Sequence, residues 1–553
     1  MMMSLLDHSN DGICKLGIYG TGGVGKATLA KALYNSIFYQ FEGACFLFDV
    51  REASKKYQGI FHLQQTLLAE ILEEKKTKFG SVDEGISRIK HRISHKRVLL
   101  VLDDVDEVER LEKLADIACF FKEEDLESVE EKLAAYDFGA RFYIEVLVDK
   151  SLITVADNGN LGMHDLAQQM GREIVRQEAP SNPCKRSRLW HYKDVLKVLR
   201  ENLGSSNIKE IMLDLPQQEV EWSGMAFEKM SNLRILVVRN SQFSTNPKYF
   251  PSSLRLLDCA GYPSTTLPPD FSPKKLVYTK LPGSLFRLEE PFKRFECVTY
   301  MNFSHCKFIT KYLICMSQFQ NLRRLLFTRC RNLITVRGSV GSLSKLIELD
   351  LSVCSSLTSF PREIKMASLQ KLHVSYCRSV DYFPCIVGKM EALRTIYAEG
   401  TAIKELPPSI GNLPTLESLA ISSHKSIREL PSSLFTLQNL SWLNLCGIQP
   451  PSRKSLMKLM QESQPVISCA NLETLNLENC CLTDEDLHLA LNCFWNVQKL
   501  ILSGSNFVSL PACIKECANL QTLALNNCKR LRDIPELPSK LENIEAEDCT
   551  VRH

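Results

Sequence analysis

The feature that most constrains this chain is a leucine pattern that recurs from about residue 208 to the end of the sequence. The pattern is L-x-x-L-x-L-x-x-C/N, and successive copies usually begin 21 to 25 residues apart. One copy supplies a short strand and a return segment, and it cannot bury its own apolar side. Copies must therefore stack, so the sequence predicts a solenoid with one parallel strand per repeat on its concave face.

Fifteen copies can be recognised in the sequence. The clear copies begin at Leu322, Leu346, Leu369, Leu472, Leu520 and Leu541. The weaker copies begin at Ile208, Leu233, Leu254, Leu276, Val298, Leu393, Leu416, Leu440 and Val497. The step from 440 to 472 is longer and contains Pro450 and Pro451, which predicts a protruding loop there.

Cysteines follow the same repeat. The chain has 21 cysteines, and seven occupy one repeat position: Cys306, Cys330, Cys354, Cys377, Cys480, Cys528 and Cys549. This position lies at the corner between strand and return, where cysteine acts as a small buried apolar side chain. Identical sites spaced one repeat apart favour packing over pairing, so we expect free thiols and a cytosolic setting.

A second feature is the glycine-rich stretch Gly20–Thr28, which follows an apolar strand and precedes a helix. It matches the phosphate-binding loop G-x-x-x-x-G-K-[ST] except at its last position. Backbone N–H groups of such a loop surround phosphate oxygens, and Lys26 would reach the β- and γ-phosphates. The predicted binding residues are Gly20, Gly22, Gly23, Val24, Gly25, Lys26, Ala27 and Thr28.

One departure weakens this loop. Ala27 stands where a hydroxyl would ligate Mg²⁺, and Thr28 points about 100° further round the helix. The apolar strand Arg97–Leu102 then ends in Asp103 and Asp104, the Walker B form. Asp103 would hold Mg²⁺, directly or through water, and Asp104 would lie near an attacking water. We therefore predict ADP or ATP binding, leave Mg²⁺ binding in doubt, assign no catalytic residue, and expect at most a weak ATPase.

Residues 116–200 form a separate block. A helix is expected near residues 126–136, and two short strands flank an Asn-Gly turn at Asn158 and Gly159. A further helix follows from Asp165, so helix, hairpin and helix predict a winged-helix module. The basic stretch Pro180–Arg188 is interpreted as a solvated linker in preference to a nuclear-localisation signal.

Together these features predict an α/β chain of three segments. They are a partial P-loop nucleotide-binding domain at 1–115, a winged-helix-like module and linker at 116–200, and a leucine-rich-repeat solenoid at 201–553. The 67 basic and 64 acidic residues nearly cancel, which predicts neither a nucleic-acid nor a membrane partner. Without a signal peptide or an 18-residue apolar run, we expect a cytoplasmic protein, and the basic cluster leaves a nuclear location open.

This order of parts resembles the plant intracellular immune receptors of the NB-ARC leucine-rich-repeat class. Met163-His164-Asp165 is similar to the family's Met-His-Asp motif, which implies that His164 contacts the ADP phosphate. Asp106 is typical of the TIR subclass. The resemblance implies a disease-resistance switch, driven by ADP and ATP, whose repeats sense a pathogen effector or a guarded host protein. Pairing with full-length receptors is a further implied partnership.

The chain also departs from this family. No TIR domain is expected, and therefore no TIR NADase, because about a dozen residues precede the P-loop strand. The family's sensor arginine, Gly-Leu-Pro-Leu motif and small helical subdomain would fall between Leu114 and Asp116, where the sequence has no room for them. The alternative function is thus a non-signalling interaction protein with a vestigial nucleotide site. Neither reading predicts cell death from this chain alone.

Partner recognition is expected on the concave strands and the loop near Pro450. Positions that flank the repeat leucines should face solvent. The candidates are Arg323, Arg324, Glu348, Lys371, His373, Arg394, Tyr397, Glu417, Trp442, Glu473 and Lys499.

Overall fold

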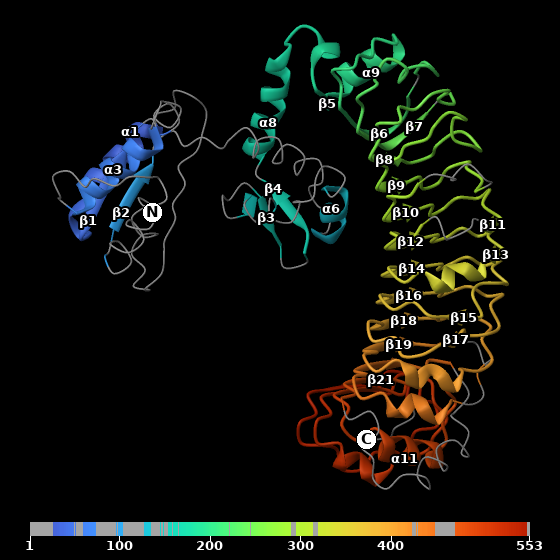
Figure 1. Ribbon diagram of the computed structural model, residues 1–553. Coiled ribbons are helices and arrows are strands. Elements are labelled where there is room, and N and C mark those ends of the chain that lie inside the picture. The colour runs from blue at the N-terminus through green and yellow to red at the C-terminus, as the bar shows by residue number, and fades with distance from the viewer. Residues whose placement is uncertain are drawn as a thin grey trace. The chain divides into compact units, whose positions relative to one another are not determined.

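The computed structural model describes residues 26–48, 50, 59–72, 96, 98–102, 126–133, 144, 147–148, 153–156, 159–163, 165–220, 222–243, 245–288, 295–312, 319–422, 427, 430–447 and 471–549. The chain divides into two compact units (Figure 1). The first comprises Met1–Glu130 and Phe138–Ile174, and the second comprises Glu131–Asp137 and Val175–His553.

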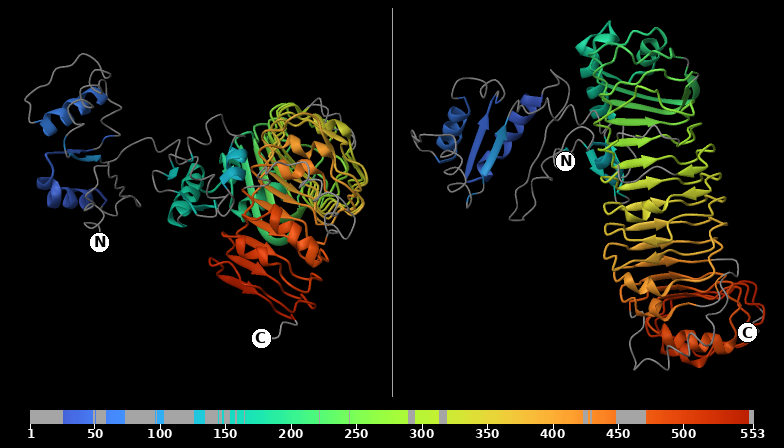
Figure 2. Two further views of the ribbon diagram at one scale, coloured as in Figure 1. Left: turned by 90° about the horizontal axis from the view of Figure 1, so that it is seen from below. Right: turned by 45° about the vertical axis from the view of Figure 1, so that its right-hand side comes forward.

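The first unit contains a parallel strand pair. Strands β1 (Gly43–Leu47) and β2 (Val98–Leu102) pair in register from Gly43↔Val98 to Leu47↔Leu102. Helices α1 (Lys26–Ile37) and α3 (Gly59–Leu72) lie on opposite sides of this pair (Figure 2). The helix expected after the P-loop and the strand expected before Asp103 therefore form, and the apolar strand expected before the loop lies outside the described residues.

A small apolar core joins α3 to β1. Its buried members are Cys45, Leu47, Leu67 and Ile71. Gly43 allows this close approach, because a Cβ there would lie 2.9 Å from Ile71 Cγ2 and from the Ile71 carbonyl oxygen. The short helix η2 (Phe38–Gln40) follows α1 directly.

The winged-helix elements also appear as expected. Strands β3 (Ile153–Val155) and β4 (Leu161–Met163) form an antiparallel hairpin, and Gly159 has φ of +80° in its turn. Helix α6 (Leu126–Leu133) precedes the hairpin and α8 (Asp165–Glu178) follows it. The hairpin and both helices are confirmed.

The second unit is built on one 16-stranded sheet. Its strands are β5 (Arg188–Leu189), β6 (Glu210–Val220), β7 (Ile235–Phe243), β8 (Leu256–Cys259), β9 (Tyr278–Lys280), β10 (Tyr300–Asn302), β12 (Arg324–Leu326), β14 (Glu348–Asp350), β16 (Lys371–His373), β18 (Thr395–Tyr397), β19 (Ser418–Ala420), β20 (Trp442–Asn444), β21 (Thr474–Asn476), β22 (Lys499–Ile501), β23 (Thr522–Ala524) and β24 (Asn543–Glu545). Neighbouring strands are parallel and follow the chain order, as Figures 1 and 2 show.

Each of the fifteen predicted repeats supplies one of these strands, which begins two residues after the predicted start. The sixteenth strand, β5, comes from the stretch interpreted as linker. The return segments contain α9 (Tyr192–Arg200), α11 (Asp484–Cys493), the short helices η3 (Pro183–Lys185), η5 (Gly338–Ser342), η6 (Pro408–Asn412), η7 (Ser432–Thr436) and η8 (Ala512–Glu516), and the strand pairs β11 (Lys311–Tyr312) with β13 (Thr335–Val336) and β15 (Glu363–Ile364) with β17 (Cys385–Ile386). The repeat leucines form one continuous core between these two sides.

The repeat cysteines form a hydrogen-bonded ladder inside this core. All seven are free, and each thiol lies 2.9–3.5 Å from a backbone carbonyl oxygen of the preceding repeat. Cys330 Sγ, for example, donates to Phe303 O at 3.0 Å. Burial raises the pKa of Cys306, Cys330 and Cys377 to about 12. The predicted packing role of these cysteines is confirmed, and their thiols additionally donate to backbone carbonyl groups.

The residue before each ladder cysteine adopts a left-handed backbone conformation. The positions are His305, Arg329, Val353, Tyr376, Asn479, Asn527 and Asp548, with φ between 56° and 63°. The same turn in other repeats uses Gly283, Gly400 and Gly504. Val353 is the unfavourable member, because a β-branched side chain is sterically opposed to this region.

Candidate functional site

The predicted nucleotide site of the first unit lies only partly within the described residues. Since β1 and β2 are parallel, their carboxyl ends at Leu47 and Leu102 lie at one edge of the sheet, and Asp103 follows Leu102 directly. Helix α1 begins at Lys26, and Ala27 and Thr28 are exposed in its first turn. Gly20, Gly22, Gly23, Val24, Gly25, Asp103, Asp104 and His164 lie outside the described residues. The strand and helix context fits a phosphate site, and the residue roles stay predictions.

A hollow of about 850 Å³ lies elsewhere on this unit. Its lining includes Tyr34, Phe38, Phe46, Phe48 and Glu70, from α1, η2, β1 and α3. The rings contact one another, with 5.5 Å between the Tyr34 and Phe46 centroids and 4.3 Å between Phe46 and Phe48. Neither Ala27 nor Thr28 belongs to the lining, so this aromatic hollow is distinct from the start of α1.

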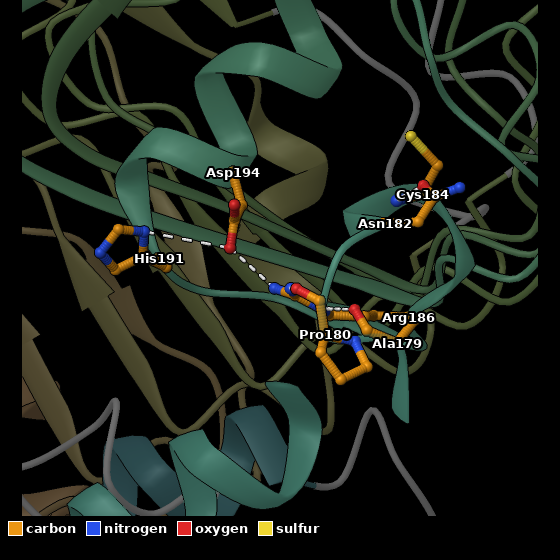
Figure 3. A network of polar contacts seen from close by, with 7 residues as sticks. All are labelled: Ala179, Pro180, Asn182, Cys184, Arg186, His191 and Asp194. Atoms are coloured by element: carbon orange, nitrogen blue, oxygen red, sulfur yellow. Dashed lines mark hydrogen bonds and ion pairs between the residues drawn. The ribbon is translucent and has the colours of Figure 1, made fainter. Parts of the chain in front are cut away.

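A polar network orders the segment that joins α8 to the repeats (Figure 3). Arg186 is 6% exposed and donates three hydrogen bonds. Nε donates to Ala179 O and Nη2 to Pro180 O, both at 2.9 Å, and Nη1 donates to Asp194 Oδ2 at 2.7 Å. Asp194 lies in the first turn of α9, so one guanidinium joins the end of α8 to α9.

Further contacts complete this junction. Glu178, the last residue of α8, accepts from Ser187 N at 2.6 Å and Ser187 Oγ at 2.7 Å. Arg188 Nε lies 3.3 Å from Glu210 Oε2, across the β5–β6 pair. Asn182 Oδ1 accepts from Cys184 N at the start of η3.

The interpretation of Pro180–Arg188 as a solvated linker is therefore wrong. Arg186 and Arg188 are both buried and ion-paired, so they do not offer a free basic cluster for nuclear import. The positive charge and the prolines of this stretch are typical of a linker. Asp194 and Glu210, which pair with its two arginines, lie further along the chain.

The strand positions of the repeats form two columns on the concave face. One column includes Arg324, Glu348, Lys371, Thr395, Ser418 and Trp442, and the other includes Asp350, His373, Tyr397, Ala420 and Asn444. Most predicted surface candidates are exposed or half-buried, as expected.

Arg324 is the exception among these candidates. It is 8% exposed, and its Nε lies 3.1 Å from Glu131 Oε1 and 3.4 Å from Glu348 Oε2. Glu131 belongs to the short segment that groups with the repeats. Lys132, next to it, is 1% exposed and lies over the Tyr278 ring at 5.6 Å. The prediction that Arg324 faces solvent is wrong, because periodicity within the repeats could not reveal a covering segment.

Comparisons with known protein families match three regions of the chain. The NB-ARC domain matches residues 2–128, and the winged-helix domain of Roq1-like disease resistance proteins matches residues 107–179. The leucine-rich repeats of RPS4B-like disease resistance proteins match residues 365–552. An NB-ARC domain implies nucleotide binding in general, and leucine-rich repeats generally mediate protein interactions.

Curated relatives agree with these matches. The TMV resistance protein N of Nicotiana glutinosa is 27% identical over 723 residues, covering 99% of this chain and 62% of that protein. The Arabidopsis thaliana disease resistance protein RPS4B is 30% identical over 79% of this chain and 35% of its own length. Arabidopsis RPP2A is 35% identical over 60% of this chain and 25% of its own length. The chain is a member of the NB-ARC leucine-rich-repeat class of plant disease resistance proteins.

The chain spans under two thirds of the length of each of these relatives. The alignment with protein N is 723 residues long, whereas this chain has 553, so protein N contains internal segments without a counterpart here. Among the described helices, none has the length and apolar character that a bilayer crossing requires.

Proposed function

We propose that this chain acts in plant disease resistance as a receptor component whose repeats recognise a protein, either a pathogen effector or a guarded host protein. The observation that carries the proposal is the ladder of parallel strands from β5 to β24, which has half-buried or exposed polar positions from β14 onward. The family matches in the same chain support the immune role. The free cysteines support a cytoplasmic location.

We also propose that the first unit binds ADP in preference to ATP, weakly and with little dependence on Mg²⁺. Gly20, Gly22, Gly23, Val24, Gly25 and Lys26 would surround the phosphates, with Ala27 and Thr28 at the helix start. Asp103 and Asp104 would face the metal and water positions, and His164 would contact a phosphate. Because Ala27 lacks a hydroxyl, the site has lost one metal ligand while its backbone cradle is retained in sequence.

The second candidate is a non-signalling interaction protein whose nucleotide site is vestigial. Ala27 favours it, because the exposed methyl group at this helix start cannot ligate a metal. The domain limits proposed for either function are 1–115, 116–200 and 201–553. Lys26→Ala separates the two candidates, since it should abolish ADP binding in the first and change nothing in the second.

Transient expression in leaf tissue tests the immune role. The chain is expressed alone and beside a full-length resistance protein of the same class, with matched protein levels. We expect no cell death from the chain alone and a measurable change in the response of the full-length receptor. Cell death from the chain alone, or an unchanged receptor response at equal expression, would contradict the proposal.

A further inference from the structure

Three aromatic side chains form a row on the concave face. His373, Tyr397 and Trp442 come from β16, β18 and β20, and all three are half-buried. The His373 and Tyr397 ring centroids are 5.0 Å apart, and those of Tyr397 and Trp442 are 6.1 Å apart with an interplanar angle of 80°. Edge-to-face contacts hold such rings in fixed orientations and leave ring surface open to solvent.

Two carboxylates lie beside this row. Glu399 follows β18 by two residues and Glu478 follows β21 by two residues, so they occupy equivalent repeat positions. Asn444 Nδ2, on β20, donates to Glu399 Oε1 at 2.8 Å and fixes that carboxylate. Gly447 N, in the turn after β20, donates to Glu478 O at 2.7 Å, so both glutamates lie at the carboxyl end of β20. In agreement, burial raises the pKa of the Cys446 thiol and these two carboxylates raise it further.

Several other acidic groups of this face have a cationic partner, unlike these two carboxylates. Glu348 has Arg324 as its partner, Asp258 has Arg239 at 3.6 Å, and Glu417 pairs with Arg394. Among the residues that the structure describes, no lysine or arginine forms an ion pair with Glu399 or Glu478. Half-buried carboxylates without a cation leave a local negative potential, which is strengthened by the low polarity of the adjacent rings.

We propose that this acid–aromatic patch, formed by His373, Tyr397, Glu399, Trp442 and Glu478, binds a cationic side chain presented by the partner protein, with arginine favoured over lysine. A guanidinium stacks on aromatic faces and donates to carboxylates in a fixed plane, whereas an ammonium is a compact, strongly hydrated charge. The two carboxylates disfavour phosphate-bearing partners such as nucleic acid. This inference rests on the proposed recognition role of the repeats.

The strand face near β9 and β12 is already covered, which favours the acid–aromatic patch as the place where a partner binds. Around Tyr278 and Arg324 the strand face is buried and its charges are already paired with Glu131 and Glu348. Repeats from β16 onward keep half-buried or exposed polar positions. A central anchor of aromatic groups surrounded by polar positions is the usual organisation of a binding hot spot.

The test uses the full chain and three fluorescently labelled nine-residue peptides of sequence Gly-Ser-Gly-X-Gly-X-Gly-Ser-Gly, with X as arginine, lysine or citrulline. Citrulline keeps the shape of arginine and removes its charge. Anisotropy titrations should show at least about tenfold tighter binding of the arginine peptide than of the citrulline peptide. The lysine peptide should lie between them, and added salt should weaken the arginine peptide most.

Variants locate the binding. Glu399→Gln combined with Glu478→Gln, and separately Trp442→Ala, should each weaken arginine-peptide binding by about tenfold. The matched control is Glu545→Gln combined with Glu547→Gln, the same charge change at exposed positions on and after β24, which have no aromatic row. It should change binding less than twofold. Trp442→Phe conserves an aromatic face and should retain most of the binding. This result would show that the loss in Trp442→Ala comes from the missing ring and not from misfolding.

Equal binding of the citrulline peptide, an equal loss in the Glu545/Glu547 control, or no saturable binding up to millimolar peptide would overturn the inference. The leaf assay distinguishes its failure from that of the proposed function. If the Glu399/Glu478 variant modulates the full-length receptor as the unaltered chain does, the patch is not the recognition site while the receptor role stands. If the unaltered chain has no effect, the receptor role itself fails.

Discussion

The junction between α8 and the repeats makes a quantitative prediction for Arg186→Ala. The substitution removes three hydrogen bonds from a charged donor, each of which contributes about 1.5–3 kcal/mol in a buried setting. The Asp194 side chain is 27% exposed, Ala179 is half-buried and Pro180 is exposed, so we expect all three acceptors to regain water. The expected loss is therefore about 2–3 kcal/mol, below the 3–5 kcal/mol found when a fully buried pair is broken.

Native-state hydrogen exchange of peptides from residues 175–200 measures this loss in the full chain. A loss of 2–3 kcal/mol in local opening free energy corresponds to about 30- to 150-fold faster exchange. Arg186→Lys keeps the charge without the planar fork and should lose less. Lys185→Ala is the control, because Lys185 is exposed and its removal should shift the free energy by under about 0.5 kcal/mol. Equal effects of Arg186→Ala and Lys185→Ala would refute the assignment of this network as the structural junction.

The structure of the repeats leads to three further predictions, two for substitutions and one for the pH dependence of stability. In η5, Gly341→Ala places a Cβ 2.4 Å from Glu363 O and should destabilise by about 1–3 kcal/mol in urea unfolding, whereas Gly338→Ala has nothing within 4 Å and should be tolerated. Val353→Asn should stabilise by about 1 kcal/mol, measured as a higher melting temperature, because asparagine tolerates a φ of 61° better than valine does. The raised pKa of Cys306, Cys330 and Cys377, about 12, keeps their thiols protonated in the native state, while the unfolded thiols ionise near pH 8.5. Stability should consequently fall between about pH 9 and pH 12, by up to about 1.4 kcal/mol per pH unit per thiol, and denaturant titrations at several pH values check the sign.

The repeat solenoid was predictable because each strand is encoded locally. A leucine spacing fixes which residues point inward, so the start of every strand from β6 to β24 in the main sheet could be read from one template. The common repeat position of the seven cysteines could be predicted from the same template. Its hydrogen bond could not be predicted, because the acceptor is a carbonyl of the preceding repeat whose distance depends on how the repeats stack.

The failures concern contacts between residues far apart in sequence. Arg186 was interpreted as solvated because its charge is locally typical of a linker, yet it is buried and bonded to Asp194 of α9 and to carbonyls just after α8. Arg324 was expected at the surface because the repeat pattern cannot show a segment from outside the repeats. The acid–aromatic patch was only partly visible, since Tyr397 and Trp442 were candidates while Glu399 and Glu478 were not.

The central claim for the nucleotide part is that a phosphate cradle persists without a metal ligand. Titration calorimetry of the purified chain with ADP and ATP, each with and without Mg²⁺, tests this claim most directly, with Lys26→Ala and Ala27→Thr as variants. We predict weak ADP binding that is nearly independent of Mg²⁺, lost in Lys26→Ala, and made Mg²⁺-dependent for ATP by Ala27→Thr. Tight Mg²⁺-dependent ATP binding with turnover by the unaltered chain would contradict the account.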